Sequence, residues 1–297
     1  MKRLMIGQYG HFDKNKQGRD YRDYFFGVEV CMMEKEEDIV ALVREAQHQQ
    51  FQIGVHFPLR KARELRDPLV LAINQDVKDK AYACIEDEIA YIHEKMKPSY
   101  ILFHYPKPVI ISKAVDWRHW RFGDEREFVE EAAYDYETFL SDSERFLEYL
   151  TQQATIYGFT PILELDGLNA YMVHREGFIK LLDKYSVVKI CLDISRLHLQ
   201  ACMDQAFNPF ETVVKYAPYT ELVHLSNGRL EDNHTNNHYP ALPELSSDKG
   251  WADIEHYLST MNHYNKQYKL LFEHRSDRIT DEQLEACYTW VNRLINT

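Results

Sequence analysis

Short apolar runs alternate along the chain with longer stretches in which apolar residues recur at helical spacing. Eight of the short runs are continuously apolar, which is typical of β-strands that are covered on both faces. They span residues 4–9, 25–31, 51–57, 100–105, 160–165, 187–194, 221–226 and 269–274. The amphipathic stretches predict helices over residues 34–50, 78–96, 127–155, 169–185, 208–217, 251–264 and 281–295. Residues 10–24 are polar and predict an irregular crossover.

Strand–helix units repeated in this order predict an α/β protein with right-handed crossovers, its parallel sheet closed into a single (β/α)8 TIM barrel. A doubly wound open sheet is the alternative arrangement for the same alternation. No polar linker, low-complexity segment or repeat divides the chain. We therefore expect one domain over residues 1–297.

Composition narrows the classes of function. The 297 residues include 35 Lys and Arg against 47 Asp and Glu, a formal net charge of −12. Such a charge repels phosphates at long range, which disfavours nonspecific binding to nucleic acid. No apolar run approaches the ~18 residues of a transmembrane helix, and the N-terminus lacks a signal-peptide pattern. The 5 cysteines have no CxxC spacing, which favours reduced thiols and a cytoplasmic protein.

Metal-capable side chains stand at or near the C-terminal end of six predicted strands. They are His56, His104, Glu164, Asp193, His224 and Glu273. The carboxyl ends of barrel strands surround the active site, so these side chains should converge. A lone histidine or glutamate on a strand is more often structural. Here such residues occur at the same place, the end of the strand, in six predicted strands, and this favours a metal site. Clustered carboxylates repel one another, and a divalent cation would compensate them. Mixed nitrogen and oxygen ligands suit Zn, Mn or Co better than Mg or Ca. His56 and His104 could instead contact substrate hydroxyls.

Two loops on the same predicted face combine basic and aromatic residues, over 59–68 and 105–126. This mixture fits a sugar ring, a phosphate or a nucleotide. The candidate substrate-binding residues in these loops are Arg60, Arg121, Trp117 and Trp120. The alternative is a loop that packs its tryptophans on the barrel rim and exposes its charges to water. No phosphate-binding glycine motif and no serine nucleophile elbow occurs.

From about residue 50 to about residue 275, the sequence resembles the xylose isomerase-like TIM barrels. That superfamily includes sugar phosphate isomerases and epimerases and the family 2 AP endonucleases that are similar to endonuclease IV. The resemblance lies in the order and spacing of GVHFPL, ILFHYPKP, PILELDG, ICLDISRLHL, VHLSNGRLEDNHTNNHYP, GWADIEHYL and LLFEHR. It implies that one catalytic metal is held by Glu164, Asp193, His224 and Glu273. In the endonuclease branch, it implies a second metal at His56 and His104, with Glu164 bridging both.

The chain departs from the family pattern after Asp193. The family often has a histidine three residues later, and the endonuclease branch uses it for a third zinc, whereas this chain has Arg196. The possible remnants of that third site are Asp232, His234 and His238. His198 could take the place of the missing ligand. The loss of one ligand puts the third metal in doubt.

Arg196 cannot bind a cation, because a guanidinium stays charged and has no lone pair to offer. Its planar fork suits a phosphate or a carboxylate. We expect it to anchor the anionic end of a small substrate, helped by Arg60 or Arg121. The alternative is a salt bridge from Arg196 to Asp232 or Glu231 that closes a vacant metal site.

Three functions are compatible with these residues. The favoured one is a divalent-metal-dependent isomerase or epimerase of a sugar, sugar acid or sugar phosphate, in which Glu164 and Glu273 move the proton. The alternative is a binuclear phosphodiesterase similar to the AP endonucleases, with nucleic acid as the less favoured partner. The third is a metal-stabilised binding protein without turnover. The number of bound ions, one or two of Zn, Mn or Co, distinguishes the first two. The substrate and the oligomeric state are not indicated by the sequence.

Overall fold

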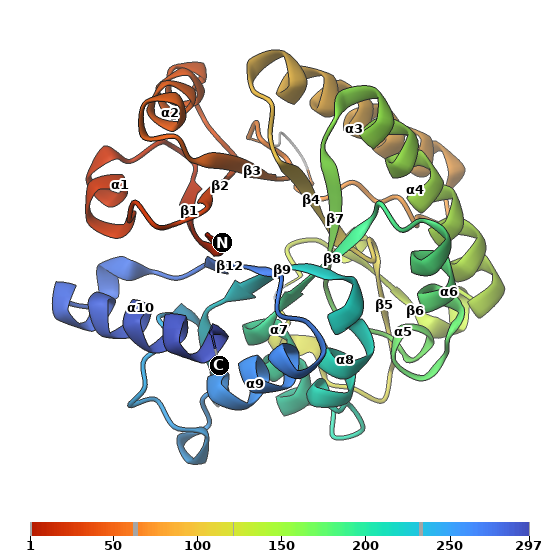
Figure 1. The fold of residues 1–297 in the computed structure, drawn as a ribbon. Helices are drawn as coiled ribbons and strands as arrows, with labels where there is room; N and C mark the ends of the chain where they lie inside the picture. The colour runs from red at the N-terminus through yellow and green to blue at the C-terminus, as the bar shows by residue number, and fades with distance from the viewer. Residues whose placement is uncertain (1, 62–64, 121, 232–233, 297) are drawn as a thin grey trace.

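Eight parallel strands close into a barrel in the computed structural model, which describes residues 2–61, 65–120, 122–231 and 234–296 (Figure 1). In chain order the strands are β1 (Leu4–Tyr9), β2 (Gly27–Cys31), β3 (Gln52–His56), β4 (Tyr100–Tyr105), β7 (Thr160–Leu165), β8 (Lys189–Asp193), β9 (Thr220–Leu225) and β12 (Lys269–Phe272). β12 pairs in parallel with β1, which closes the sheet. The predicted (β/α)8 TIM barrel is confirmed, and the open sheet is excluded.

The helices surround this barrel (Figure 1). They are α1 (Lys14–Asp20), α2 (Glu36–Gln49), α3 (Gln75–Lys95), α4 (Tyr136–Tyr157), α5 (Ala170–His174), α6 (Gly177–Lys184), α7 (Ile194–Met203), α8 (Pro209–Tyr216), α9 (Ile254–Tyr264) and α10 (Asp281–Ile295). Phe103 of β4 meets Phe146 of α4 with ring centroids 6.2 Å apart, one contact of the core between sheet and helices. In the described part of the chain, no helix is long and apolar enough to cross a membrane.

Two predicted helices differ from those in the structure. The helix predicted over 127–155 begins only at Tyr136, because β6 (Phe128–Glu130) pairs with β5 (Val109–Ile111) before it. Asp135 then caps α4 by accepting a hydrogen bond from the backbone N–H of Thr138 at 2.9 Å. The helix predicted over 169–185 is interrupted between α5 and α6. Lys215 donates hydrogen bonds to the carbonyls of Val173 and Arg175 there, at 3.1 and 2.7 Å.

The sequence does not predict three further elements: α1, α7 and a hairpin after β9. Residues 10–24 contain the helix α1, which is polar and begins where Asp13 accepts hydrogen bonds from two backbone N–H groups. α7 follows β8 directly, so the apolar run predicted as a strand over 187–194 passes into the helix at Ile194. The hairpin of β10 (Asn227–Glu231) and β11 (His234–Tyr239) extends the loop that follows β9.

An apolar layer fills the barrel interior below the carboxyl ends of the strands. It consists of Met5, Tyr100, Leu102, Ile162, Cys191, Leu222 and Leu271. Side chains of a strand alternate between its two faces, so the residue two positions later points into the barrel again. The position two residues beyond Ile162, Cys191, Leu222 and Leu271 is therefore directed to the mouth of the barrel.

Candidate metal centre

Four side chains converge at this mouth, each two residues beyond a member of the apolar layer. They are Glu164 of β7, Asp193 of β8, His224 of β9 and Glu273 directly after β12. Each offers one ligand atom, and the four atoms lie within 4.8 Å of one another. Because side chains alternate between the two faces of a strand, four positions that are far apart in the sequence meet as one group of three carboxylates and one imidazole.

His56 of β3 and His104 of β4 join the group through Glu164. Glu164 Oε2 lies 3.1 Å from His56 Nε2 and 3.3 Å from His104 Nε2. The two imidazole rings meet edge to face, with centroids 4.8 Å apart. All three side chains are buried, and they form a second group of ligand-capable atoms that shares Glu164 with the first.

Two guanidinium groups already contact these histidines. Arg66 Nη2 lies 3.1 Å from Nδ1 and 3.2 Å from Nε2 of His56. Arg196 Nη2 lies 3.3 Å from His104 Nε2. The other nitrogen of His104, Nδ1, is 2.8 Å from Asp67 Oδ2. A divalent ion at these histidines would therefore stand against two permanent positive charges.

Arg196 is embedded among carboxylates. Its Nη1 donates to Asp166 Oδ1 at 2.6 Å, and its Nε lies 3.0 Å from Glu164 Oε1 and 3.5 Å from Asp193 Oδ2. Of the predicted alternative partners, Asp232 lies outside the described residues, and Glu231 accepts a hydrogen bond from Arg229 Nε at 3.1 Å. Of the described ion-pair partners of Arg196, Glu164 and Asp193 belong to the candidate metal-binding group, and Asp166 lies next to it.

Together these contacts join six carboxylates and three permanently charged cations. The carboxylates are Glu29, Asp67, Glu164, Asp166, Asp193 and Glu273, and the cations are Arg66, Lys107 and Arg196. Lys107 Nζ bridges Asp166 and Asp67 at 2.7 and 3.2 Å. The carboxylates leave three negative charges in excess, and charges removed from water need compensation. A divalent ion would supply two positive charges.

Burial and neighbouring charges together raise the pKa of Asp193 and lower the pKa of Glu164. Burial raises the pKa of Asp193 to about 6, and the charges of Glu273 and Glu164 add to this. Burial also acts to raise the pKa of Glu164, but the charges of His104 and His224 outweigh it and hold that pKa well below its usual range. Burial lowers the pKa of His224, but its neighbours, Cys191 and Glu29 first and then Glu164 and Glu273, outweigh burial and raise that pKa well above the usual value. Without a metal ion, protonation is what relieves the negative charge.

Two buried atoms of the four-residue group make no hydrogen bond: His224 Nδ1, and Glu164 Oε1, which has only the ion-pair contact with Arg196 Nε at 3.0 Å. His224 Nδ1 lies 3.2 Å from Glu273 Oε2 and 3.6 Å from Glu164 Oε2, contacts that bring charges together without hydrogen-bond geometry. An unpaired buried nitrogen or oxygen is unfavourable unless a ligand completes it. One imidazole with three carboxylates is a donor set that Zn or Mn accepts. The residues therefore fit a divalent ion.

Solved structures share this barrel. The TTHB071 protein from Thermus thermophilus, soaked with ZnCl2, has a TM-score of 0.59 and 15% identity, covering 98% of this chain and 97% of that one. D-psicose 3-epimerase in the presence of D-fructose has a TM-score of 0.57 and 12% identity, covering 100% of both chains. An AP endonuclease of family 2 from Brucella melitensis has a TM-score of 0.53 and 13% identity, covering 99% of both chains.

The chain has the fold of the xylose isomerase-like TIM barrels. The resemblance expected from the sequence motifs is confirmed at the level of the fold. No protein-family model matches the sequence, and no curated protein matches it. Identities this low establish a shared fold and not a shared activity, since one barrel hosts many chemistries.

Of the predicted third-site residues around the candidate metal centre, His238 is the one whose side chain the structure describes. His238 Nδ1 lies 3.2 Å from the backbone oxygen of Glu273, which places it beside the mouth. The backbone of His234 begins β11, and its side chain lies outside the described residues, as does all of Asp232. His198 Nε2 is 3.0 Å from the backbone oxygen of Gly250, so the structure gives it another partner.

The predicted substrate-binding residues are distributed over the loops of the same face. Trp120 is buried against the loop after β7, since a Cβ on Gly167 would lie 3.5 Å from its Nε1. Trp117 meets it edge to face at 5.5 Å, so both tryptophans pack on the rim. Arg60 donates to Glu88 and Asp87 of α3 at 2.6 Å each. Arg121 lies outside the described residues.

Sequence reasoning did not assign five charged residues to the centre, although Arg66 and Lys107 lie in the two basic loops predicted for this face: Glu29, Arg66, Asp67, Lys107 and Asp166. Two of them carried a signal. Glu29 is a lone carboxylate within the apolar strand FFGVEVC, and Asp166 follows Glu164 in ELDG. The other three come from loops, where no periodicity shows which way a side chain points.

Proposed function

We propose that this barrel is a divalent-metal-dependent isomerase or epimerase of a sugar, sugar acid or sugar phosphate. One ion of Zn, Mn or Co would be held by Glu164, Asp193, His224 and Glu273. The observation that carries the proposal is the pair of guanidinium contacts at the second ligand group. Arg66 reaches His56 and Arg196 reaches His104, so a second ion there would meet positive charge. Chemistry that needs one ion is favoured over a binuclear phosphodiesterase.

The bound ion would polarise a substrate carbonyl and acidify the neighbouring C–H bond. Glu164 and Glu273 reach the centre from β7 and from the end of β12. One would remove the proton from carbon as a general base, and the other, protonated from solvent, would donate a proton to the resulting carbanion; the first then loses its proton to solvent. Burial acts to raise the pKa of Glu273, but the charge of His224 outweighs burial and lowers that pKa in the metal-free protein.

His56, His104 and Arg196 have supporting roles in this proposal. The two histidines hold Glu164 Oε2 from one side. Contact between these histidines and substrate hydroxyls stays a prediction. Arg196 holds Glu164, Asp166 and Asp193 in place. Its role as an anchor for the anionic end of a substrate stays a prediction, and a comparison of phosphorylated with neutral sugars tests it.

The test follows solvent hydrogen into substrate carbon. Metal-loaded protein is incubated in D2O with neutral ketoses, ketose phosphates and keto sugar acids, and deuterium next to the carbonyl is measured by NMR. We expect incorporation into at least one sugar, one bound ion per chain, and loss of about 10²-fold or more in Glu164→Gln. Glu86→Gln, on the exposed face of α3, is the control.

Abasic DNA and simple phosphodiesters are assayed in parallel. Hydrolysis of either, with two ions per chain, would establish the phosphodiesterase instead. A metal-loaded protein that turns over neither class of substrate would be the binding protein without activity. Near-full exchange activity in Glu164→Gln would remove this residue from the reaction.

A further inference from the structure

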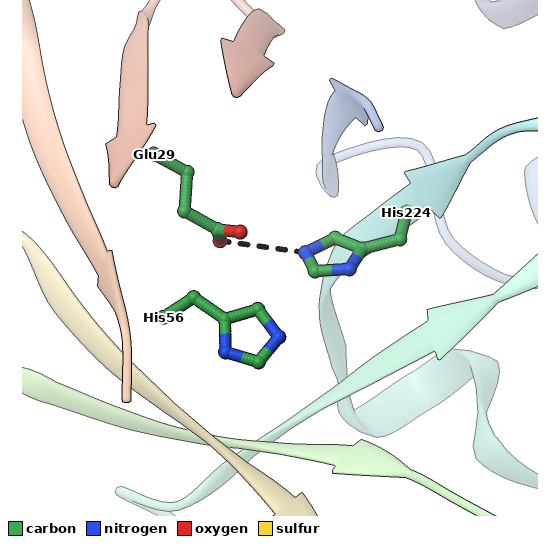
Figure 2. A group of neighbouring side chains, drawn as sticks. All are labelled: Glu29, His56 and His224. Carbon is green, nitrogen blue, oxygen red and sulfur yellow. Dashed lines mark hydrogen bonds and ion pairs between the residues drawn. The ribbon is translucent and has the colours of Figure 1, made fainter. Parts of the chain in front are cut away.

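The carboxylate of Glu29 lies inside the barrel beside the metal centre, and the mechanism above gives it no role. It extends from β2, and the residue is only 4% exposed. Its Oε2 lies 3.3 Å from His224 Nε2, and Figure 2 shows the two side chains facing each other with His56 beside them. The hydroxyl of Tyr100 donates to the same oxygen at 2.8 Å. Glu29 thus contacts a metal-ligand candidate on the side away from the other carboxylates.

The two ring nitrogens of His224 face different partners. Nε2 faces Glu29, whereas Nδ1 faces Glu273 and Glu164 at 3.2 and 3.6 Å and has no hydrogen-bond partner. A neutral imidazole carries one proton, and only the nitrogen without it can bind a cation. A proton on Nε2 is donated to the Glu29 carboxylate. A proton on Nδ1 would instead leave the Nε2 lone pair against that carboxylate, which is repulsive.

Tyr100 and Gly54 support the hydrogen bond between His224 and Glu29. Tyr100 reaches Glu29 across the barrel interior because β3 has a glycine at the crossing point. A Cβ on Gly54 would lie 2.1 Å from Tyr100 Cζ and 2.4 Å from its hydroxyl oxygen. A buried carboxylate needs hydrogen-bond donors, and Tyr100 and His224 supply two. The glycine, the tyrosine and the glutamate therefore form one unit that ends on the ring of His224.

We propose that Glu29 is a positioning residue that accepts a hydrogen bond from the Nε2–H group of His224, so that Nδ1 is free to bind the metal ion. The inference rests on the metal centre of the proposed function but not on the reaction performed there. The rival interpretation makes Glu29 itself a ligand. Ligand-capable atoms of Glu29, His56 and His224 also lie within 4.8 Å of one another, and a cation there would use Nε2 instead.

The first experiment identifies the bound nitrogen. Protein labelled with ¹⁵N is loaded with Zn²⁺, and long-range ¹H–¹⁵N NMR spectra of the histidine rings are recorded, with His224→Gln used for assignment. We expect a zinc-bound Nδ1 and a protonated Nε2. A zinc-bound Nε2 would overturn the proposal. Failure to bind Zn²⁺ would overturn it together with the metal centre. Absence of sugar turnover with Nδ1 bound would overturn only the proposed reaction.

The second experiment measures Zn²⁺ affinity by competition with a chromophoric chelator. Glu29→Gln keeps an acceptor of the same shape without the charge, and we expect affinity to fall about 10–100-fold with the number of bound ions unchanged. Tyr100→Phe leaves the carboxylate in place and should cause a smaller loss. Glu88→Gln is the matched control. Glu88 of α3 is also a buried carboxylate, but it pairs with Arg60 and not with a residue of the metal centre.

Two results would contradict this assignment. Unchanged Zn²⁺ affinity in Glu29→Gln, with circular dichroism like that of wild type, would make the Glu29 contact merely structural. Loss of one of two bound ions in that variant would make Glu29 a ligand. If Glu29→Gln does not fold, the Zn²⁺-loaded wild-type spectrum and the Tyr100→Phe affinity still decide between the two interpretations.

Discussion

His274 follows Glu273 directly but faces the helices rather than the metal centre. Its ring stacks on Tyr288 of α10 with centroids 6.4 Å apart, and its Nδ1 has no hydrogen-bond partner. Burial lowers the pKa of His274 to about 3, and the charge of Lys16 adds to this. The unfolded chain has a histidine pKa near ~6.5. Between these values the unfolded chain binds the extra proton, so the stability is complete above about pH 6.5 and is lost as the pH falls.

Replacing His274 should reduce this loss of stability at low pH. Between about pH 7 and about pH 5, we expect the free energy of unfolding of wild type to fall about 2 kcal/mol more than that of His274→Phe. Urea unfolding at the two pH values measures the difference. His48→Gln, an exposed histidine of α2, should behave like wild type. Equal losses in wild type and His274→Phe would mean that His274 is not held neutral in the folded protein.

Single residues were predictable from sequence where a strand fixed their direction. Glu164 and Asp193 end buried strands, so their shared position along the strand was enough to indicate one site. Asp67 and Lys107 could not be found in this way, because loop residues have no period and their contacts are set by the folded barrel. The guanidinium of Arg196 was expected at the mouth, but its three carboxylate partners depend on how β7, β8 and α7 meet.

At the scale of elements, the strands were predictable and several helix ends were not. Each predicted strand agrees with the observed one to within two residues, because burial on both faces makes the apolar run coincide with the strand. The break between α5 and α6 was missed, since Lys215 of α8 satisfies the carbonyls there and no local pattern shows it. α1 was missed because its cap at Asp13 precedes a polar helix.

The start of α10 was predictable because its signal is local. Thr280 accepts a hydrogen bond from the backbone N–H of Gln283 at 3.3 Å, and the Gln283 side chain accepts one from the backbone of Thr280 at 3.1 Å. Thr280→Ala removes this capping box and should lower the free energy of unfolding by about 1 kcal/mol. Chemical denaturation measures the change. Thr280→Ser should retain most of the stability, and a loss as large as that of alanine would argue against the cap.

At the scale of the molecule, the barrel brings buried carboxylates together at the carboxyl ends of its strands. Burial raises the pKa of Asp193 to about 6, with Glu273 and Glu164 adding to the effect. Between the unfolded value, near ~3.9, and this value, the folded protein holds a proton that the unfolded chain has lost. The stability from protonated Asp193 is therefore present below about pH 4 and lost as the pH rises through 6. Above that, the ionised group destabilises the metal-free protein.

A metal ion and a substitution at Asp193 should therefore each raise stability, because both relieve the same negative charge. At about pH 8 with chelator, Asp193→Asn should be more stable than wild type by about 1–3 kcal/mol, since it removes an unfavourable charge. With Zn²⁺ at about 100 times its Kd, wild type should gain about 2.7 kcal/mol and the variant clearly less. Urea unfolding under both conditions gives the four free energies, and Asp248→Asn, exposed on the surface, is the control. An equal gain from Zn²⁺ in both proteins would show that Asp193 is not a ligand. A metal-free variant less stable than metal-free wild type would show that excess negative charge is not what the ion relieves.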